Sequence, residues 1–535
     1  MAAQGAWAHS LPVADPAEAQ RQDLALMSLA TLRTGDILQV EGDASMETAL
    51  PAPAVIDFSW PEVQLLLKRF ADHLIAHLTS LPSTRQSPWG TMNHATAVFT
   101  LAEATYLKRT NIKHANLANL YAILAMTAYY LEFKDSDECC NFKSWQDFGS
   151  VASEKAKLHL QESLRTETRG PQSAKYKEQL MALTALKSLA YITGNDKEAR
   201  CYLLDAERLM RARGLAKREI SHKARLLHHV YTYARVVGES TYVLHDYPAL
   251  QQSLELNGLQ RPRASERTDG ANTRLDDFLR IGPRISEEEV EQQEHQDAQA
   301  GVQDIHLEDA RGYTGNIYHV IYGIPEKWLS LVSQTTRLAN FMDTVRIAGE
   351  PRGSEVDKML HMRASRLEDT ICAFVAENSA TWDPNIGEYH QVGTTPTAHM
   401  FRCLNSALII FFYRRIRDVN PWMLQSHVDD IIRGLDEYND SLAQYNLPGP
   451  GVIWPAFMAG CEAIGGPRRD ALRRWMEEGY AKCGFQTYRI AKEAMMEVWA
   501  KNDEGSSRSK QKGRGRVRTT WMDVSRQSNK WLMLY

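Results

Sequence analysis

Cysteine is scarce and scattered in this sequence. Only seven of the 535 residues are cysteines, and none precedes Cys139. An odd number of thiols in a chain this long excludes a disulfide scaffold and indicates a reducing compartment. Cys139 and Cys140 are adjacent and no other pair lies close together, which is a poor arrangement for one tetrahedral ion. We therefore expect no metal site and no cofactor.

A secretory leader, long apolar runs and a large charge excess are also missing. The first residues carry Asp15, Glu18 and Asp23 where a signal peptide would have a basic start and an apolar core. The most apolar stretch, 115–131, is too short to cross a bilayer and contains two asparagines, so it predicts a buried helix. The formal net charge is only -4, whereas a domain that wraps nucleic acid is typically basic. We expect no membrane contact, and any contact with DNA must come from a local patch or a partner.

The spacings that common catalytic sites require are absent. His73 and His77 have the i, i+4 spacing of a zinc hydrolase, but the glutamate that should follow the first histidine is missing. No Gly-rich loop ends in Gly-Lys-Ser/Thr, and no serine occupies a Gly-x-Ser-x-Gly elbow. His228 and His229 would face different sides of a helix, which favours satisfied buried polar groups over a catalytic cluster. We expect no catalytic residue and no enzyme activity.

Helical periodicity dominates what is present. Asn195 and Glu198 have the spacing of an N-cap and its N3 partner, and Gly214 ends the apolar stripe that follows them. β-Alternation is hard to find anywhere, so the sequence predicts an all-α fold, an irregular array of antiparallel helical hairpins in two packed halves. Further helices are expected from Ser59 to Leu78 and over 176–191, 221–244, 328–344 and 356–378.

Composition divides the chain into four parts. Residues 1–57 are rich in small residues and proline without a sustained period, which predicts a disordered N-terminal lead-in. Residues 256–312 combine few apolar side chains with a run of acids and predict a disordered acidic linker; an interaction tail is the alternative. One helical half is expected over 58–255 and the second over 313–535.

A basic segment, 506–518, lies near the C-terminus. Its cations alternate with small or polar residues, so it cannot form a packed apolar stripe. Such a segment is typical of a nuclear-import signal or a loop that contacts phosphate, and a surface insertion without a partner is the alternative. The candidate residues are Arg508, Lys510, Lys512, Arg514, Arg516 and Arg518.

The stretch GVIWPAFMAGCEA, 451–463, contains residue types that also occur in active sites. Trp454 and Pro455 follow a turn-like NLPGP and are expected to begin a helix, since proline is tolerated in a first turn. Phe457 and Cys461 share one apolar face, and no cation on that face would stabilise a thiolate. We predict an architectural helix with an inert Cys461.

Several segments carry a family resemblance through their order and co-occurrence: 175–215, 221–244, 321–343, 451–463 and, more weakly, the ending from 494 to 535. Together they resemble the regulatory region of fungal-specific transcription factors of the binuclear zinc cluster class, in particular the arginine metabolism regulation protein II-like group. The resemblance implies an all-helical regulatory domain in the nucleus that controls a metabolic or biosynthetic gene set.

The same resemblance implies a DNA-binding cluster of six closely spaced cysteines, which this sequence does not contain. Either the chain is a truncated or mispredicted product, or it acts without its own DNA-binding module. We therefore do not expect direct DNA binding, and expect the transcription machinery or another DNA-binding regulator as partner. A small-molecule effector and a homodimer stay open. The alternative function is a non-catalytic helical scaffold that binds proteins.

Overall fold

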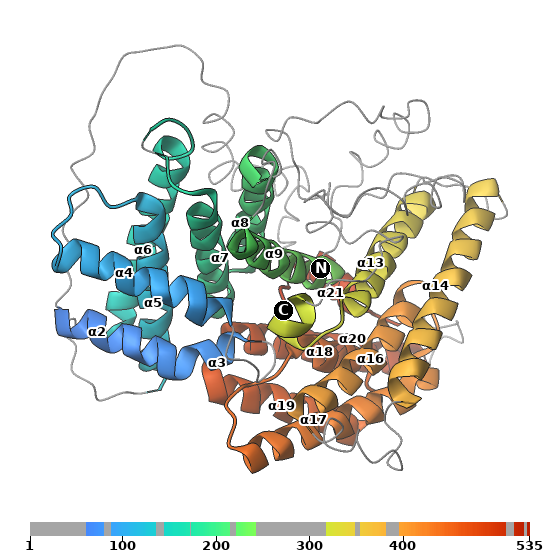
Figure 1. Cartoon of the computed structure of the whole chain (residues 1–535). Coiled ribbons are helices and arrows are strands. Elements are labelled where there is room, and N and C mark those ends of the chain that lie inside the picture. The colour runs from blue at the N-terminus through green and yellow to red at the C-terminus, as the bar shows by residue number, and fades with distance from the viewer. Residues whose placement is uncertain are drawn as a thin grey trace, which may run out of the picture. The chain divides into compact units, whose positions relative to one another are not determined.

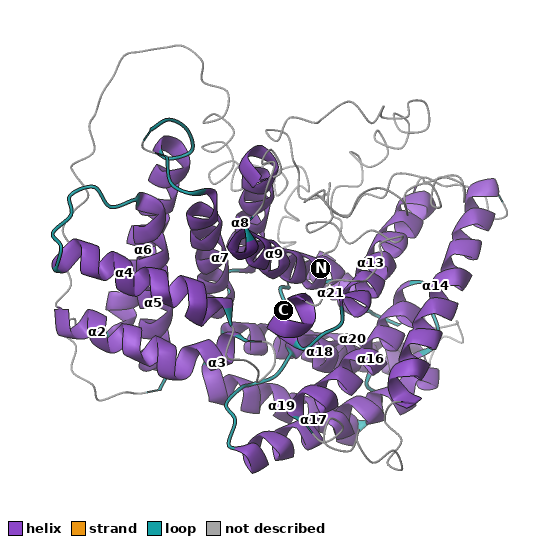
Figure 2. Cartoon of the chain, viewed as in Figure 1, coloured by secondary structure: helices purple, strands orange, loops and turns teal. Residues whose placement is uncertain are grey.

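Helices form all the regular secondary structure in the part of the chain that can be described (Figures 1 and 2). No strand occurs among these residues, so the predicted all-α class is confirmed. The predicted lead-in, 1–57, and linker, 256–312, lie outside them. The computed structural model describes residues 60–79, 87–134, 144–171, 173–214, 221–241, 317–347, 354–380, 395–509, 518–528 and 532–534.

The N-terminal half is built around α5, which is buried along most of its length between α4, α6 and α7 (Figure 1). Apolar residues occur on all sides of this helix, so it can only be stable inside the protein. This confirms the buried helix predicted over 115–131. The elements are α2 (Trp60–Arg69), η1 (a π-helical turn, Phe70–Leu74), α3 (Ile75–Leu78), η2 (a second π-helical turn, Trp89–His94), α4 (Ala95–Thr105), α5 (His114–Phe133), α6 (Trp145–Thr166), α7 (Tyr176–Thr193), α8 (Asp196–Leu209), η3 (π-helical, Met210–Gly214) and α9 (His222–Ser240).

The C-terminal half packs around α18, which contacts α16, α17, α19 and α20. Helices α16 and α17 form a hairpin, joined by a short 3-10 turn, η7. The elements are α12 (Ile317–Tyr322), α13 (Glu326–Ile347), α14 (Glu355–Ala380), α16 (Pro396–Arg415), η7 (Pro421–Leu424), α17 (Gln425–Tyr445), α18 (Ile453–Glu462), α19 (Gly466–Cys483), α20 (Gln486–Ser509) and α21 (Trp521–Ser528).

Helix ends follow local sequence signals. The Asn195 side chain accepts a hydrogen bond from the Glu198 amide at 3.3 Å, and its own amide group donates to the Glu198 carboxylate at 2.7 Å. Gly194 ends α7 with a φ of 77°, a conformation that costs glycine little. The predicted start of α8 is thereby confirmed, and the helical segment is described as far as Gly214.

The stretch 451–463 is an architectural helix, as predicted. Helix α18 is wholly buried, and the Trp454 ring packs edge-on against Trp328 and Phe411 at centroid distances of 5.5 and 5.7 Å. Burial raises the pKa of Cys461 well above that of a free thiol, which agrees with an inert side chain.

Both halves contribute to one hydrophobic core. Several hydrogen bonds join them directly. Among these, Thr487 Oγ1 donates to the Tyr191 carbonyl at 2.8 Å, Trp454 Nε1 donates to Ser240 Oγ at 2.8 Å, and Arg200 donates to the Leu532 carbonyl at 2.7 Å. Because these partners are buried, each bond fixes one half against the other.

Candidate functional site

The basic segment 506–518 extends beyond the described residues. Helix α20 runs to Ser509 and includes Arg508, whereas Lys510, Lys512, Arg514 and Arg516 lie outside the residues described. Arg518 is described and half-buried. Burial raises the pKa of the Glu462 carboxyl, and the positive charges of Arg414 and then Arg518 partly offset that effect. Arg518 therefore also interacts with the body of the protein.

The histidines considered for catalysis do not gather. His228 is fully buried and its Nε2 lies 2.6 Å from the Tyr176 hydroxyl, while Nδ1 of His229 lies 2.7 Å from the Arg225 carbonyl. These are satisfied buried polar groups, as predicted. His73 is exposed beside Arg69, whereas His77 is largely enclosed, so these two histidines do not form a shared site.

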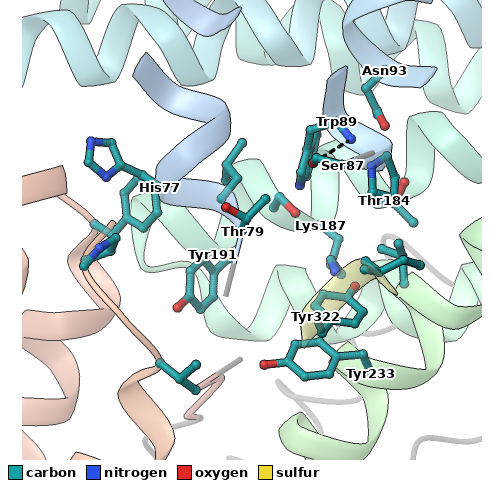
Figure 3. Close-up of a pocket in the computed structure, with 18 of the residues that line it drawn as sticks. His77, Thr79, Ser87, Trp89, Asn93, Thr184, Lys187, Tyr191, Tyr233 and Tyr322 are labelled. Atoms are coloured by element: carbon teal, nitrogen blue, oxygen red, sulfur yellow. Dashed lines mark hydrogen bonds between the residues drawn. The ribbon is translucent and has the colours of Figure 1, made fainter. Parts of the chain in front are cut away.

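A cavity lies where the two halves of the protein meet (Figure 3). It has about 870 Å³ of space that no protein atom fills, part of it open to solvent. Its walls come from the segment after η1, from η2, α7, α9 and α12, from residues 450–452 before α18, and from the start of α20. Cavities at such junctions are frequent sites for small molecules.

Lys187 projects from the middle of α7 into this cavity, toward the rings of Tyr322 and Tyr233 (Figure 3). Its side chain is buried, with only 3% of the residue exposed. Burial lowers the pKa of the ammonium from 10.5 to about 7, because the charged form is poorly solvated there. A perturbed lysine inside a cavity marks a candidate binding site.

Aromatic rings form much of the wall around Lys187. Tyr233 and Tyr322 stack with a centroid distance of 4.0 Å and an interplanar angle of 17°. Trp89, Tyr191 and Tyr488 also line the cavity. Such rings offer large flat surfaces that bind planar molecules at low entropic cost.

Two wall segments of the cavity, which carry His77 and Trp89, are associated with π-helical turns. The turn η1 comes before α3, which ends in the lining residue Leu78, and η2 itself carries Trp89 and Asn93. A π-helical turn adds a residue to the helical repeat and rotates the faces of the residues that come after it, and such turns are frequent at functional sites. Sequence periodicity alone did not reveal this shift.

The shape of the cavity wall formed by residues 450–452 depends on a glycine. Gly451 has a φ of 86°, and a Cβ at this position would lie 2.8 Å from Met400 Cε. Its carbonyl accepts a hydrogen bond from the Tyr488 hydroxyl at 2.8 Å. Thus the turn that begins the stretch 451–463 shapes the cavity, a role that its sequence alone did not indicate.

A second, more polar cavity beside α6 is less suited to bind a ligand. Lys157 lines it, but its ammonium already pairs with Glu198 at 3.1 Å and Glu154 at 3.3 Å. Because charge is balanced locally, this surface has little to offer a charged ligand.

The chemistry of the main cavity favours binding. Among its described lining residues none is an Asp or Glu, and Lys187 and His77 are the basic side chains there. No group of three or more potential metal ligands occurs within the described ranges. Among the helices described, none combines the length and apolar character needed to cross a bilayer.

Similarity to known proteins identifies the family of this chain. None of the solved structures matches the chain. Arginine metabolism regulation protein II of Saccharomyces cerevisiae is 22% identical over 502 residues, which cover 86% of this chain and 56% of that protein. The chain thus spans little more than half the length of that relative. The family model described as the fungal specific transcription factor domain matches residues 65–535, and the chain therefore belongs to the fungal specific transcription factor domain family.

Proposed function

We propose that this chain is the regulatory body of a nuclear transcription regulator that controls a metabolic gene set in response to a small-molecule effector. The family match supports a role in transcription, and that family is not a known class of enzyme. The observation that supports an effector is the cavity around Lys187, which is walled by elements of both halves. A molecule bound there would contact α7, α9 and α20 together, so binding energy could change how the halves pack.

The relative's name concerns arginine metabolism, but a shared fold does not fix the pathway of this chain. The sequence contains no six closely spaced cysteines, so its residues do not fit a binuclear zinc cluster. We propose that the chain acts through the transcription machinery or another DNA-binding regulator, in line with the family's role in transcription, and a homodimer stays open.

A reporter experiment tests this proposal. The chain is fused to a heterologous DNA-binding domain and tethered upstream of a reporter gene, and in parallel its gene is deleted and all transcripts are measured. We expect the tethered chain to change reporter output and the deletion to change a coherent set of metabolic transcripts. Unchanged transcripts in both experiments would rule the proposal out in favour of a protein-binding scaffold.

The basic segment provides a separate test of location. Replacing the six cations from Arg508 to Arg518 with glutamine should abolish nuclear accumulation of a fluorescent fusion, if the segment is an import signal. The matched control replaces exposed cations on α14, Lys358 and Arg366, and should leave the fusion in the nucleus. If both variants accumulated in the nucleus to the same extent, import would not depend on this segment.

A further inference from the structure

We infer that the cavity around Lys187 binds a small molecule that combines one carboxylate with a flat, unsaturated body. This inference deepens the proposed function and rests on it only for the regulatory consequence of binding. Three observations carry it: the position of the lysine, the charge of the lining and the arrangement of the rings (Figure 3).

Lys187 defines where a negative charge would bind. Its ammonium can donate three hydrogen bonds, and a charge-assisted bond to a carboxylate is stronger in a desolvated site than in water. Ser188, the next residue on α7, also lines the cavity. A carboxylate beside Lys187 would meet a cation that a rigid helix holds in place.

The charge of the described lining residues disfavours a cationic ligand. No Asp or Glu lines the cavity in the described part of the chain, so a ligand ammonium or guanidinium would find no carboxylate there. It would also be repelled by Lys187 at close range and low dielectric. The described lining therefore selects anions over cations.

The rings around Lys187 indicate the shape of the ligand body. Tyr233 and Tyr322 form one stacked pair below the lysine, and Trp89 lies on the other side of the space (Figure 3). Aromatic faces at these places favour a planar group that can stack or pack edge-on against them. An extended aliphatic chain could not stack on these rings.

His77 supplies a polar contact away from the lysine (Figure 3). Its Nδ1 is buried and has no hydrogen-bond partner among the described residues. Burial lowers the pKa of this imidazole to about 4, so it is neutral at physiological pH. A neutral imidazole matches a hydroxyl on the ligand rather than a second charge.

Three probes with the same ring and hydroxyl isolate the effect of charge: 4-hydroxyphenylacetate, its uncharged amide 4-hydroxyphenylacetamide, and the cation tyramine. Binding of each to the full chain is measured by titration calorimetry at pH 6.5, with thermal shift as a second readout. The variants are Lys187→Met and, on the same helix, Lys177→Met, which does not line the cavity. Methionine has a similar length and suits a buried site, so Lys187→Met should fold.

We expect the carboxylate to bind the wild type at least tenfold more tightly than the amide, and tyramine not to bind. Lys187→Met should lose this preference, with at least a tenfold weaker affinity for the carboxylate, while Lys177→Met keeps it. The inference is overturned if no probe binds, if all three bind equally, or if Lys187→Met retains carboxylate binding. Failure of this test leaves the reporter result standing, and carboxylate binding without any transcript change would remove only the regulatory role.

Discussion

Single buried charges determine how this protein responds to pH. Burial raises the pKa values of Asp196 and Glu239 to about 7, although Arg200 and Arg235 respectively act in the opposite direction. Each carboxyl therefore binds its proton more tightly in the folded state, and its own contribution to the free energy of unfolding falls as pH rises from about 4 to about 7.

The largely enclosed His77 and His159 act in the opposite direction over part of this range, because burial lowers their pKa values to about 4. Lys187 acts in another window: its folded pKa of about 7 lies below 10.5, so stability rises with pH between these values.

Replacing Asp196 with asparagine tests this interpretation of the carboxyls. Asparagine keeps an oxygen that can accept the hydrogen bond from the Met533 amide, but removes the buried charge. At about 1.4 kcal/mol per pKa unit, we expect Asp196→Asn to gain a few kcal/mol over the wild type at pH 8 and almost nothing at pH 4. Urea unfolding across this pH range measures the difference. The exposed Asp440→Asn is the control, and a parallel pH profile for Asp196→Asn and wild type would contradict the prediction.

At the scale of the secondary-structure elements, close contacts between helices depend on small residues. Gly479 on α19 faces Tyr488 on α20, and a Cβ at Gly479 would lie 2.3 Å from Tyr488 Cε1. The Tyr488 ring has little freedom to move, because its hydroxyl is bonded to the Gly451 carbonyl and its side chain is buried. The α19 and α20 contact thereby holds one wall of the cavity.

We expect Gly479→Ala to destabilise the protein by about 1–3 kcal/mol through overpacking, despite the roughly 1 kcal/mol gain in helix propensity. Gly466→Ala on the same helix has open space around it and should be neutral or slightly stabilising. Denaturant unfolding compares the two variants. If Gly479→Ala were as stable as Gly466→Ala, α19 and α20 could not lie as close together as the structure shows.

At the scale of the whole molecule, the C-terminal residues join the two halves. Leu532, Met533 and Leu534 are buried, and the Leu532 carbonyl accepts hydrogen bonds from Arg200 and from Thr241 Oγ1 at 2.7 and 2.8 Å. Residues separated by more than 290 positions are thus fixed together by buried polar contacts. A molecule held in this way should unfold as one cooperative unit.

Truncation tests this cooperativity. Deleting residues 532–535 should remove one buried hydrogen bond each from Arg200 and Asp196, together with three buried apolar side chains, and cost several kcal/mol. We expect amide hydrogen exchange to accelerate in α8 and α9 of the N-terminal half as well as in α20. Faster exchange confined to the C-terminal half would show that the halves unfold independently.

Local signals in the sequence were sufficient for the helices. The sequence directly displays the neighbouring residues and the apolar spacing on which the Asn195 cap, the buried α5 and the architectural α18 depend. The same spacing correctly separated His228 from His229. The resemblance of a few segments also identified the family to which the chain belongs.

The cavity could not be predicted in the same way. Lys187 occurs in an ordinary helical repeat, and nothing near it in sequence distinguishes a buried lysine from one at the surface. The cavity around it is lined by α9, α12 and the 450–452 turn, which are distant from Lys187 in the chain and come together only after folding. The sequence by itself determined the helices, their caps and the family, because these depend on short-range pattern. Tertiary packing alone decided which side chains surround the lysine, because burial and charge environment are properties of residues brought together from both halves.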